Sequence, residues 1–101
     1  MQPVFLTSKA QADLMSITTY VFQETRSLLK TNEFIINLEM RIQALSEFPM
    51  LGRFTQHPIL SLKRYRILVL DQFVVLYLLD ETKQRVTIIR IQHQKSIPEN
   101  I

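Results

Sequence analysis

The stretch LKRYRILVLDQFVVLYLL, residues Leu62 to Leu79, consists of two apolar runs separated by Asp71-Gln72. In the first run the side chains alternate with the two-residue period of an extended strand. One side carries Tyr65, Ile67 and Val69, and the other carries Arg64, Arg66, Leu68 and Leu70. The pair Asp71-Gln72 allows a tight turn. The stretch therefore predicts two antiparallel strands, Leu62–Leu70 and Phe73–Leu79, joined as a hairpin.

Two further segments have strand character. Arg85–Gln92 follows a looser turn from Asp80 to Gln84, and it completes a predicted three-strand antiparallel meander. Val4–Thr7 is apolar but too short for a helix, so we interpret it as an added strand.

Between these strands the apolar residues recur at helical spacing. They are Ala10, Leu14, Ile17 and Val21 in one segment, and Ile35, Leu38, Ile42 and Leu45 in the next. Ser8 opens an S-x-x-Q capping box, which predicts a first helix from about Ser8 to Leu29. Thr31 is a suitable N-cap for a second helix, which ends before Pro49 because the residue preceding a proline avoids helical dihedrals.

The order of elements predicts an α+β domain, β-α-α-β-β-β. The N-terminal helical hairpin is expected to pack on one face of a small antiparallel sheet. The predicted core residues are Leu14, Ile17, Val21, Leu38, Ile42, Leu45, Tyr65, Ile67 and Val75. A chain of 101 residues suffices for a single domain, 1–101, with a loose tail from about residue 96.

Composition excludes several classes of protein. The chain has no cysteine and two histidines, which removes disulfides, thiol catalysis and any ordinary structural zinc site. The longest apolar run, Phe73 to Leu79, is far too short to span a bilayer, and the N-terminus does not resemble a signal peptide. We therefore expect a cytoplasmic protein without metal or cofactor.

The net charge of +3 belongs to the C-terminal half. No acidic residue occurs between Phe48 and Leu70 or between Thr82 and Pro98. These two segments contain Arg53, Lys63, Arg64 and Arg66, and Lys83, Arg85, Arg90 and Lys95. Such asymmetry favours a phosphate-rich or acidic partner, although a generic solubilising surface is the alternative.

Five motifs occur in a fixed order along the chain. They are A-x-A-D-L-x-x-I-x-x-Y (10–20), L-x-x-x-P-x-x-G-R (45–53), R-Y-R (64–66), V-V-L-Y (74–77) and R-I-x-H (90–93). In this order and spacing they resemble the RelE/ParE superfamily of bacterial toxins from type II toxin–antitoxin modules. The resemblance implies a small cytoplasmic toxin held inactive by an antitoxin whose disordered tail folds on binding. RelE-like members cut mRNA on the ribosome, whereas ParE-like members poison DNA gyrase and have no assigned catalytic role.

The residues that RNA-cutting relatives use are mostly missing here. Arg66 matches one strand cation, but Leu68 occupies the alternate position and Val74 replaces an arginine of the next strand. No tyrosine follows Tyr77, so an RNase would depend on His93 and His57, with Arg66 as the cation.

The R-I-x-H ending and the basic residue after it are typical of the ParE-like branch. We therefore expect a gyrase poison; the alternatives are a histidine-dependent endoribonuclease acting on ribosome-bound mRNA, and an inactive relic that only binds antitoxin. Structural roles are also open: Arg90 could pair with Glu81 or Glu47, and His93 could cap the strand end.

The predicted partner-binding residues lie in the basic half. They are Arg53, Lys63, Arg64, Arg66, Arg90, His93 and Lys95. If the arginines of the first and last meander strands share a face, Arg64, Arg66 and Arg90 would form one basic surface with Arg53. Arg64 and Arg66 would repel each other there unless an anion met them.

Overall fold

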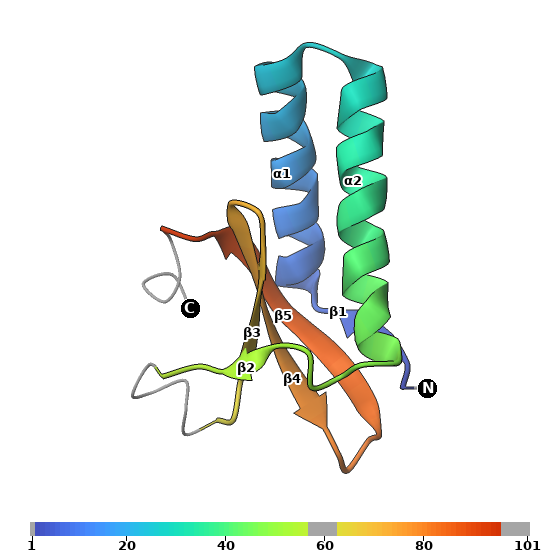
Figure 1. The fold of residues 1–101 in the computed structure, drawn as a ribbon, viewed down its shortest axis with the longest axis vertical. Coiled ribbons are helices and arrows are strands. Elements are labelled where there is room, and N and C mark those ends of the chain that lie inside the picture. Colours follow the sequence, from blue (N-terminus) through green and yellow to red (C-terminus); the bar gives the residue numbers. More distant parts are fainter. Residues whose placement is uncertain (1, 57–62, 96–101) are drawn as a thin grey trace.

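The computed structural model describes residues 2–56 and 63–95. In chain order the elements are β1 (Val4–Leu6), α1 (Ser8–Thr25), α2 (Leu28–Gln43), the 3-10 turn η1 (Ala44–Ser46), β2 (Arg53–Phe54), β3 (Arg66–Leu70), β4 (Phe73–Asp80) and β5 (Arg85–His93). The two helices form an antiparallel hairpin (Figure 1). The end of the hairpin next to β1 packs on the sheet, and the other end, where α1 turns into α2, extends beyond the sheet. The predicted α+β fold is confirmed.

The sheet has the strand order β1-β5-β4-β3-β2. β3, β4 and β5 form the predicted antiparallel meander, but β1 pairs parallel to β5, with Val4 opposite Val86. The sheet is therefore mixed rather than wholly antiparallel. Local sequence could not reveal this, because the direction of β1 depends on the helical hairpin that separates it from the meander. β2 was not predicted either, since two residues carry no alternating pattern.

The first helix begins at Ser8, as predicted, but ends at Thr25 rather than Leu29, and the second begins at Leu28, earlier than predicted. Thr7, not Ser8, caps α1, because its hydroxyl accepts the Ala10 amide at 3.0 Å. Ser27 caps α2 by accepting the Lys30 amide at 3.1 Å, whereas Thr31 lies inside the helix. Thr31 is buried and donates its hydroxyl to the Ser27 carbonyl, a bond that a threonine one turn into a helix can form.

The position of this cap gives a first prediction. Thr7→Ala should lower the free energy of unfolding by about 1–2 kcal/mol, because the hydroxyl caps α1 and also donates to the Ile89 carbonyl at 2.9 Å. Ser8→Ala should change it by less than about 0.5 kcal/mol, since alanine is a good first-turn residue. Urea denaturation of both variants checks this, and equal losses would contradict the assignment.

The core lies between the helices and the sheet. Six predicted members, Ile17, Val21, Leu38, Ile42, Leu45 and Val75, are buried, and Leu14 packs against them half-buried. Tyr65 and Ile67 are only half-buried, so their assignment to the core was wrong. The hairpin register places Leu70 opposite Phe73 and Leu68 opposite Val75, and these leucines pack on the core instead.

Candidate functional site

An ion pair joins α1 to β5. The Asp13 carboxylate accepts from Arg90 Nε at 2.8 Å and from its terminal nitrogen at 3.0 Å, and it also accepts the Ile91 amide at 2.9 Å. The hydrogen bond to Asp13 raises the pKa of Arg90 above its ordinary value. The side chains are 18% and 15% exposed, for Arg90 and Asp13 respectively. Arg90 thus has the structural ion pair that the sequence left open, but its partner is Asp13 rather than Glu81 or Glu47.

Asp13 lies where β5 loses its neighbouring strand. β1 pairs only with Val86 to Ile88, so the outer edge of β5 beyond this point faces α1. A bulge between Leu76 and Tyr77 leaves Ile89 without a partner on β4 and shifts the rest of β5. The carboxylate of Asp13 therefore takes the place of a strand carbonyl for the Ile91 amide. The only sequence signal for this contact was the aspartate in the first motif.

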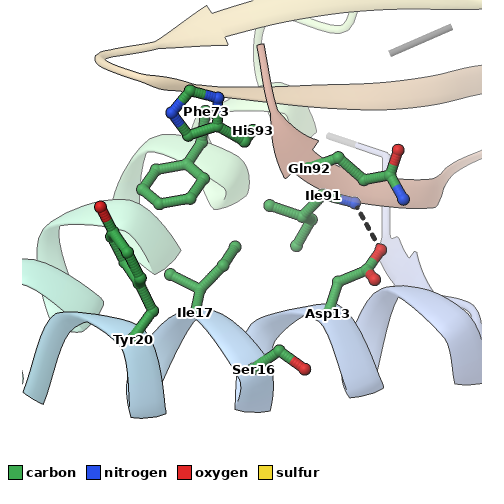
Figure 2. A pocket seen from close by; sticks show the side chains of 8 residues that line it. All are labelled: Asp13, Ser16, Ile17, Tyr20, Phe73, Ile91, Gln92 and His93. Carbon is green, nitrogen blue, oxygen red and sulfur yellow. Dashed lines mark hydrogen bonds between the residues drawn. The ribbon is translucent and has the colours of Figure 1, made fainter. Parts of the chain in front are cut away.

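A largely apolar pocket opens beside this pair, between α1 and β5 (Figure 2). It has a volume of about 310 Å³ and is lined by Asp13, Ser16, Ile17, Tyr20, Phe73, Ile91, Gln92 and His93. Phe73 forms edge-to-face contacts with Tyr20, Phe34 and His93, with the His93 ring centre at 5.9 Å. The pocket is thus bounded on one side by an aromatic cluster centred on Phe73.

His93 itself is held by packing and by one backbone contact. Its Nδ1 accepts the Lys95 amide at 3.2 Å, which leaves Nε2 available to a partner. Within residues 2–56 and 63–95 no carboxylate forms an ion pair with His93. The other candidate, His57, lies outside the described residues, as does the tail predicted from residue 96.

Four residues along β4 from Phe73, on the same face of the sheet, three of the motifs meet at Tyr77. Its hydroxyl donates to the Pro49 carbonyl at 2.7 Å and accepts the Gly52 amide at 2.8 Å. Arg66 then donates to the Gly52 carbonyl at 2.7 Å. Burial raises the pKa of the Tyr77 phenol above its ordinary value, so the hydroxyl stays neutral and can donate.

This contact explains the single glycine of the chain. A Cβ on Gly52 would lie 2.6 Å from the Ile67 carbonyl oxygen, and 2.7 and 2.8 Å from two atoms of the Tyr77 side chain. The P-x-x-G-R loop must approach β3 and β4 this closely for Tyr77 to bond it. The loop in turn fixes the guanidinium of Arg66.

Two arginines share one aromatic ring next to this loop. The guanidinium carbon of Arg66 lies 3.9 Å from the ring centre of Phe54, and that of Arg64 lies 4.9 Å from it. They border a second cavity of about 530 Å³, which we call the arginine pocket. It is lined by Met50, Phe54, Lys63, Arg64, Arg66, Leu78, Leu79, Asp80 and Glu81. Phe54 was missed because a lone exposed aromatic residue carries no sequence signal.

The predicted basic residues do not form one surface. Lys63, Arg64 and Arg66 lie together, but β4 separates their strand from β5, and Arg90 is bound to α1. Arg53 is exposed and pairs with Ile67, whereas its neighbour Phe54 pairs with Arg66, so Arg53 points to the opposite face. Lys95 is exposed beyond the end of β5.

The described part of the chain contains neither a membrane-spanning helix nor a cluster of metal ligands. None of the helices there is long and apolar enough to cross a membrane. No group of three or more acidic or histidine side chains in these residues is arranged to hold a metal ion.

Comparison with known proteins gives a family and a fold. The family model for the ParE toxin of type II toxin–antitoxin systems (parDE) matches residues 4–98. The chain is similar to a structure of the chromosomal ParDE system of P. aeruginosa, with 21% identity, a TM-score of 0.73, and coverage of 92% of this chain and 96% of that chain. It is also similar to the RelBE2 toxin–antitoxin complex of Mycobacterium tuberculosis, with 18% identity, a TM-score of 0.63, and coverage of 92% and 98%.

No curated protein matches the chain. The two structural similarities concern the fold alone, while the family model spans nearly the whole sequence, from β1 past the R-I-x-H motif. The motifs that build the Tyr77 contact and the Asp13–Arg90 pair lie within this match. The chain therefore belongs to the ParE toxin family of type II toxin–antitoxin systems.

Proposed function

We propose that this toxin inhibits DNA gyrase and is neutralised by a cognate antitoxin in the cytoplasm. The observation that carries the proposal is the distance between the groups that RNA cleavage would need. His93 on β5 pairs with Phe73 on β4, and Phe73 pairs with Leu70, the last residue of β3. Arg66 is the first residue of β3. Four residues along a strand and two strand spacings separate their backbones by about 16 Å.

This separation is unfavourable for an RNase. Cleavage through a 2′-hydroxyl needs a proton acceptor, a proton donor and cations around one phosphate. Arg90 is near His93, but its guanidinium is engaged by Asp13. The positions where RNA-cutting relatives carry cations hold Leu68, which packs on the core, and Val74, which is buried. These observations favour the ParE-like activity over the endoribonuclease.

Induction of the toxin without antitoxin tests the proposal. We expect trapped gyrase–DNA cleavage complexes, an SOS response and no codon-positioned cuts in transcripts. His93→Ala should weaken toxicity only partly, because it removes at most one contact, whereas truncation after His93 should cost more. Both variants need comparison with Lys30→Gln, a surface change on α2.

Primer extension after induction distinguishes the alternatives. A catalytic histidine contributes about 10²–10⁴-fold to rate, so transcript cuts that disappear in His93→Ala would replace this proposal by the endoribonuclease. If neither the unaltered protein nor a folded His93→Ala variant affected growth, gyrase or transcripts, the result would instead favour an inactive relic that only binds antitoxin.

A further inference from the structure

We propose that the arginine pocket binds an acidic side chain and an adjacent apolar side chain of the antitoxin segment. The inference rests on the proposed pairing with an antitoxin, and it adds the chemistry by which that partner is recognised. The pocket combines three cationic side chains, Lys63, Arg64 and Arg66, with an apolar wall that includes Phe54.

Two of the three cations, Arg66 and Arg64, already make contacts within the protein. Arg66 donates to the Gly52 carbonyl, and its guanidinium carbon lies over the Phe54 ring, 3.9 Å from the ring centre. Arg64 has a left-handed backbone, φ 60, and this conformation accompanies its contact with the same ring. A carboxylate that binds both guanidiniums would find its donors already ordered, which reduces the entropy lost on binding.

Among the described residues, no carboxylate forms an ion pair with Lys63, Arg64 or Arg66, although Asp80 and Glu81 line the same pocket. The ion pairs found there are Arg41–Asp71 and Asp13–Arg90, and neither involves Arg64, Arg66 or Lys63. Two guanidiniums on one ring repel each other, and the aromatic face offsets only part of that repulsion. An external carboxylate would relieve it, which is the charge complementarity that identifies the ligand.

The other lining residues favour a peptide over a nucleic acid. Asp80 and Glu81 also line the pocket, so it can take one carboxylate beside its arginines more readily than the several charges of a continuous phosphate backbone. Met50, Leu78 and Leu79 offer apolar surface that a phosphate chain would leave unused, whereas a leucine or valine beside the acidic residue would cover it. The ligand is therefore an amphipathic acidic peptide.

The test uses two short blocked peptides and the purified toxin. One peptide carries a glutamate between two leucines, and the other carries glutamine at the same place. We expect the glutamate peptide to shift the NMR signals of the Phe54 ring and of the Arg64 and Arg66 Nε–H groups, and to bind about tenfold more tightly than the glutamine peptide. Raising the salt concentration should weaken only the glutamate peptide.

Variants then distinguish binding in the arginine pocket from non-specific attraction to the positive charge of the protein. Arg64→Gln should remove most of the preference for glutamate, while Lys30→Gln, which deletes a cation on α2, should keep it. Arg64→Glu should reverse the preference towards a peptide with lysine in place of glutamate. Equal affinity for the glutamate and glutamine peptides, or an equal effect of Arg64→Gln and Lys30→Gln, would overturn the inference.

A third ligand addresses the other class of partner. A single-stranded oligonucleotide that bound more tightly than the glutamate peptide and shifted the same three side chains would overturn the inference in favour of nucleic acid. Because none of these measurements contains gyrase, they can succeed if the cellular target proves to be the ribosome. Gyrase inhibition with no glutamate preference would reject only the pocket.

Discussion

Asp13→Asn is expected to lower the free energy of unfolding by about 3 kcal/mol, which for a domain of this size is a fall in Tm of about 12 °C or more. The substitution leaves the Arg90 guanidinium, 18% exposed, without its carboxylate, and it weakens the acceptor of the Ile91 amide. Because α1 and β5 are joined at this point, the loss should appear as cooperative unfolding of the whole domain. Thermal and urea denaturation measure it.

Asp71→Asn provides a matched control. Asp71 pairs with Arg41 at 3.6 Å, but the side chains are 65% and 43% exposed, and asparagine tolerates the left-handed backbone at this turn. Its loss should cost less than about 0.5 kcal/mol. The double variant Asp13→Leu/Arg90→Met should recover part of the stability lost in Asp13→Asn, because it removes both charges of the pair together. If Asp13→Asn and Asp71→Asn lowered the free energy of unfolding equally, Asp13 would contribute no more stability than an exposed ion pair does.

Gly52→Ala should destabilise the domain by about 3 kcal/mol or more. The new methyl group would meet the Ile67 carbonyl oxygen at 2.6 Å and the Tyr77 ring at 2.7 Å, and the backbone atom cannot move without disturbing β3. The loop would have to withdraw, which breaks the bonds from the Gly52 amide and the Tyr77 hydroxyl. Met50→Ala, an exposed change in the same loop, is the control and should change stability little.

A companion variant separates the clash from the hydrogen bonds. Tyr77→Phe keeps the ring and leaves the Gly52 amide and the Pro49 carbonyl without this partner, at a cost of about 1–3 kcal/mol. If Gly52→Ala proved as stable as the unaltered protein, the close approach of the loop to Tyr77 would be wrong. Urea denaturation of all three variants gives the comparison.

The fold was predictable to the extent that it depends on local periodicity. The alternation in Leu62–Leu79 and the helical spacing of Ile17, Val21 and their neighbours predicted the meander and the hairpin. The face of β3 that enters the core was not predictable, because Tyr65 and Leu68 are both apolar and only the turn register decides between them.

The candidate site depended more on distant contacts. The R-Y-R motif indicated cations that need a partner, and both do contact Phe54. The pairing of Arg90 with Asp13 joins residues 77 positions apart, and a bulge in β5 accompanies it. No pattern within either segment contains that information. The same holds for the convergence of Pro49, Gly52 and Tyr77.

The parallel pairing of β1 with β5 has a consequence for how the chain folds. Thr7, just after β1, bonds the Ile89 carbonyl 82 positions later, so this half of the sheet closes only after nearly all of the intervening chain is synthesised. Contacts of such long range slow folding, because the entropy of a large loop is lost before they form. While a ribosome is still making the chain, β1 and α1 lack β5 as a partner. Any toxic activity should therefore begin only once β5 has been made, and an antitoxin already present meets a partner that becomes native only when β1 and β5 can pair.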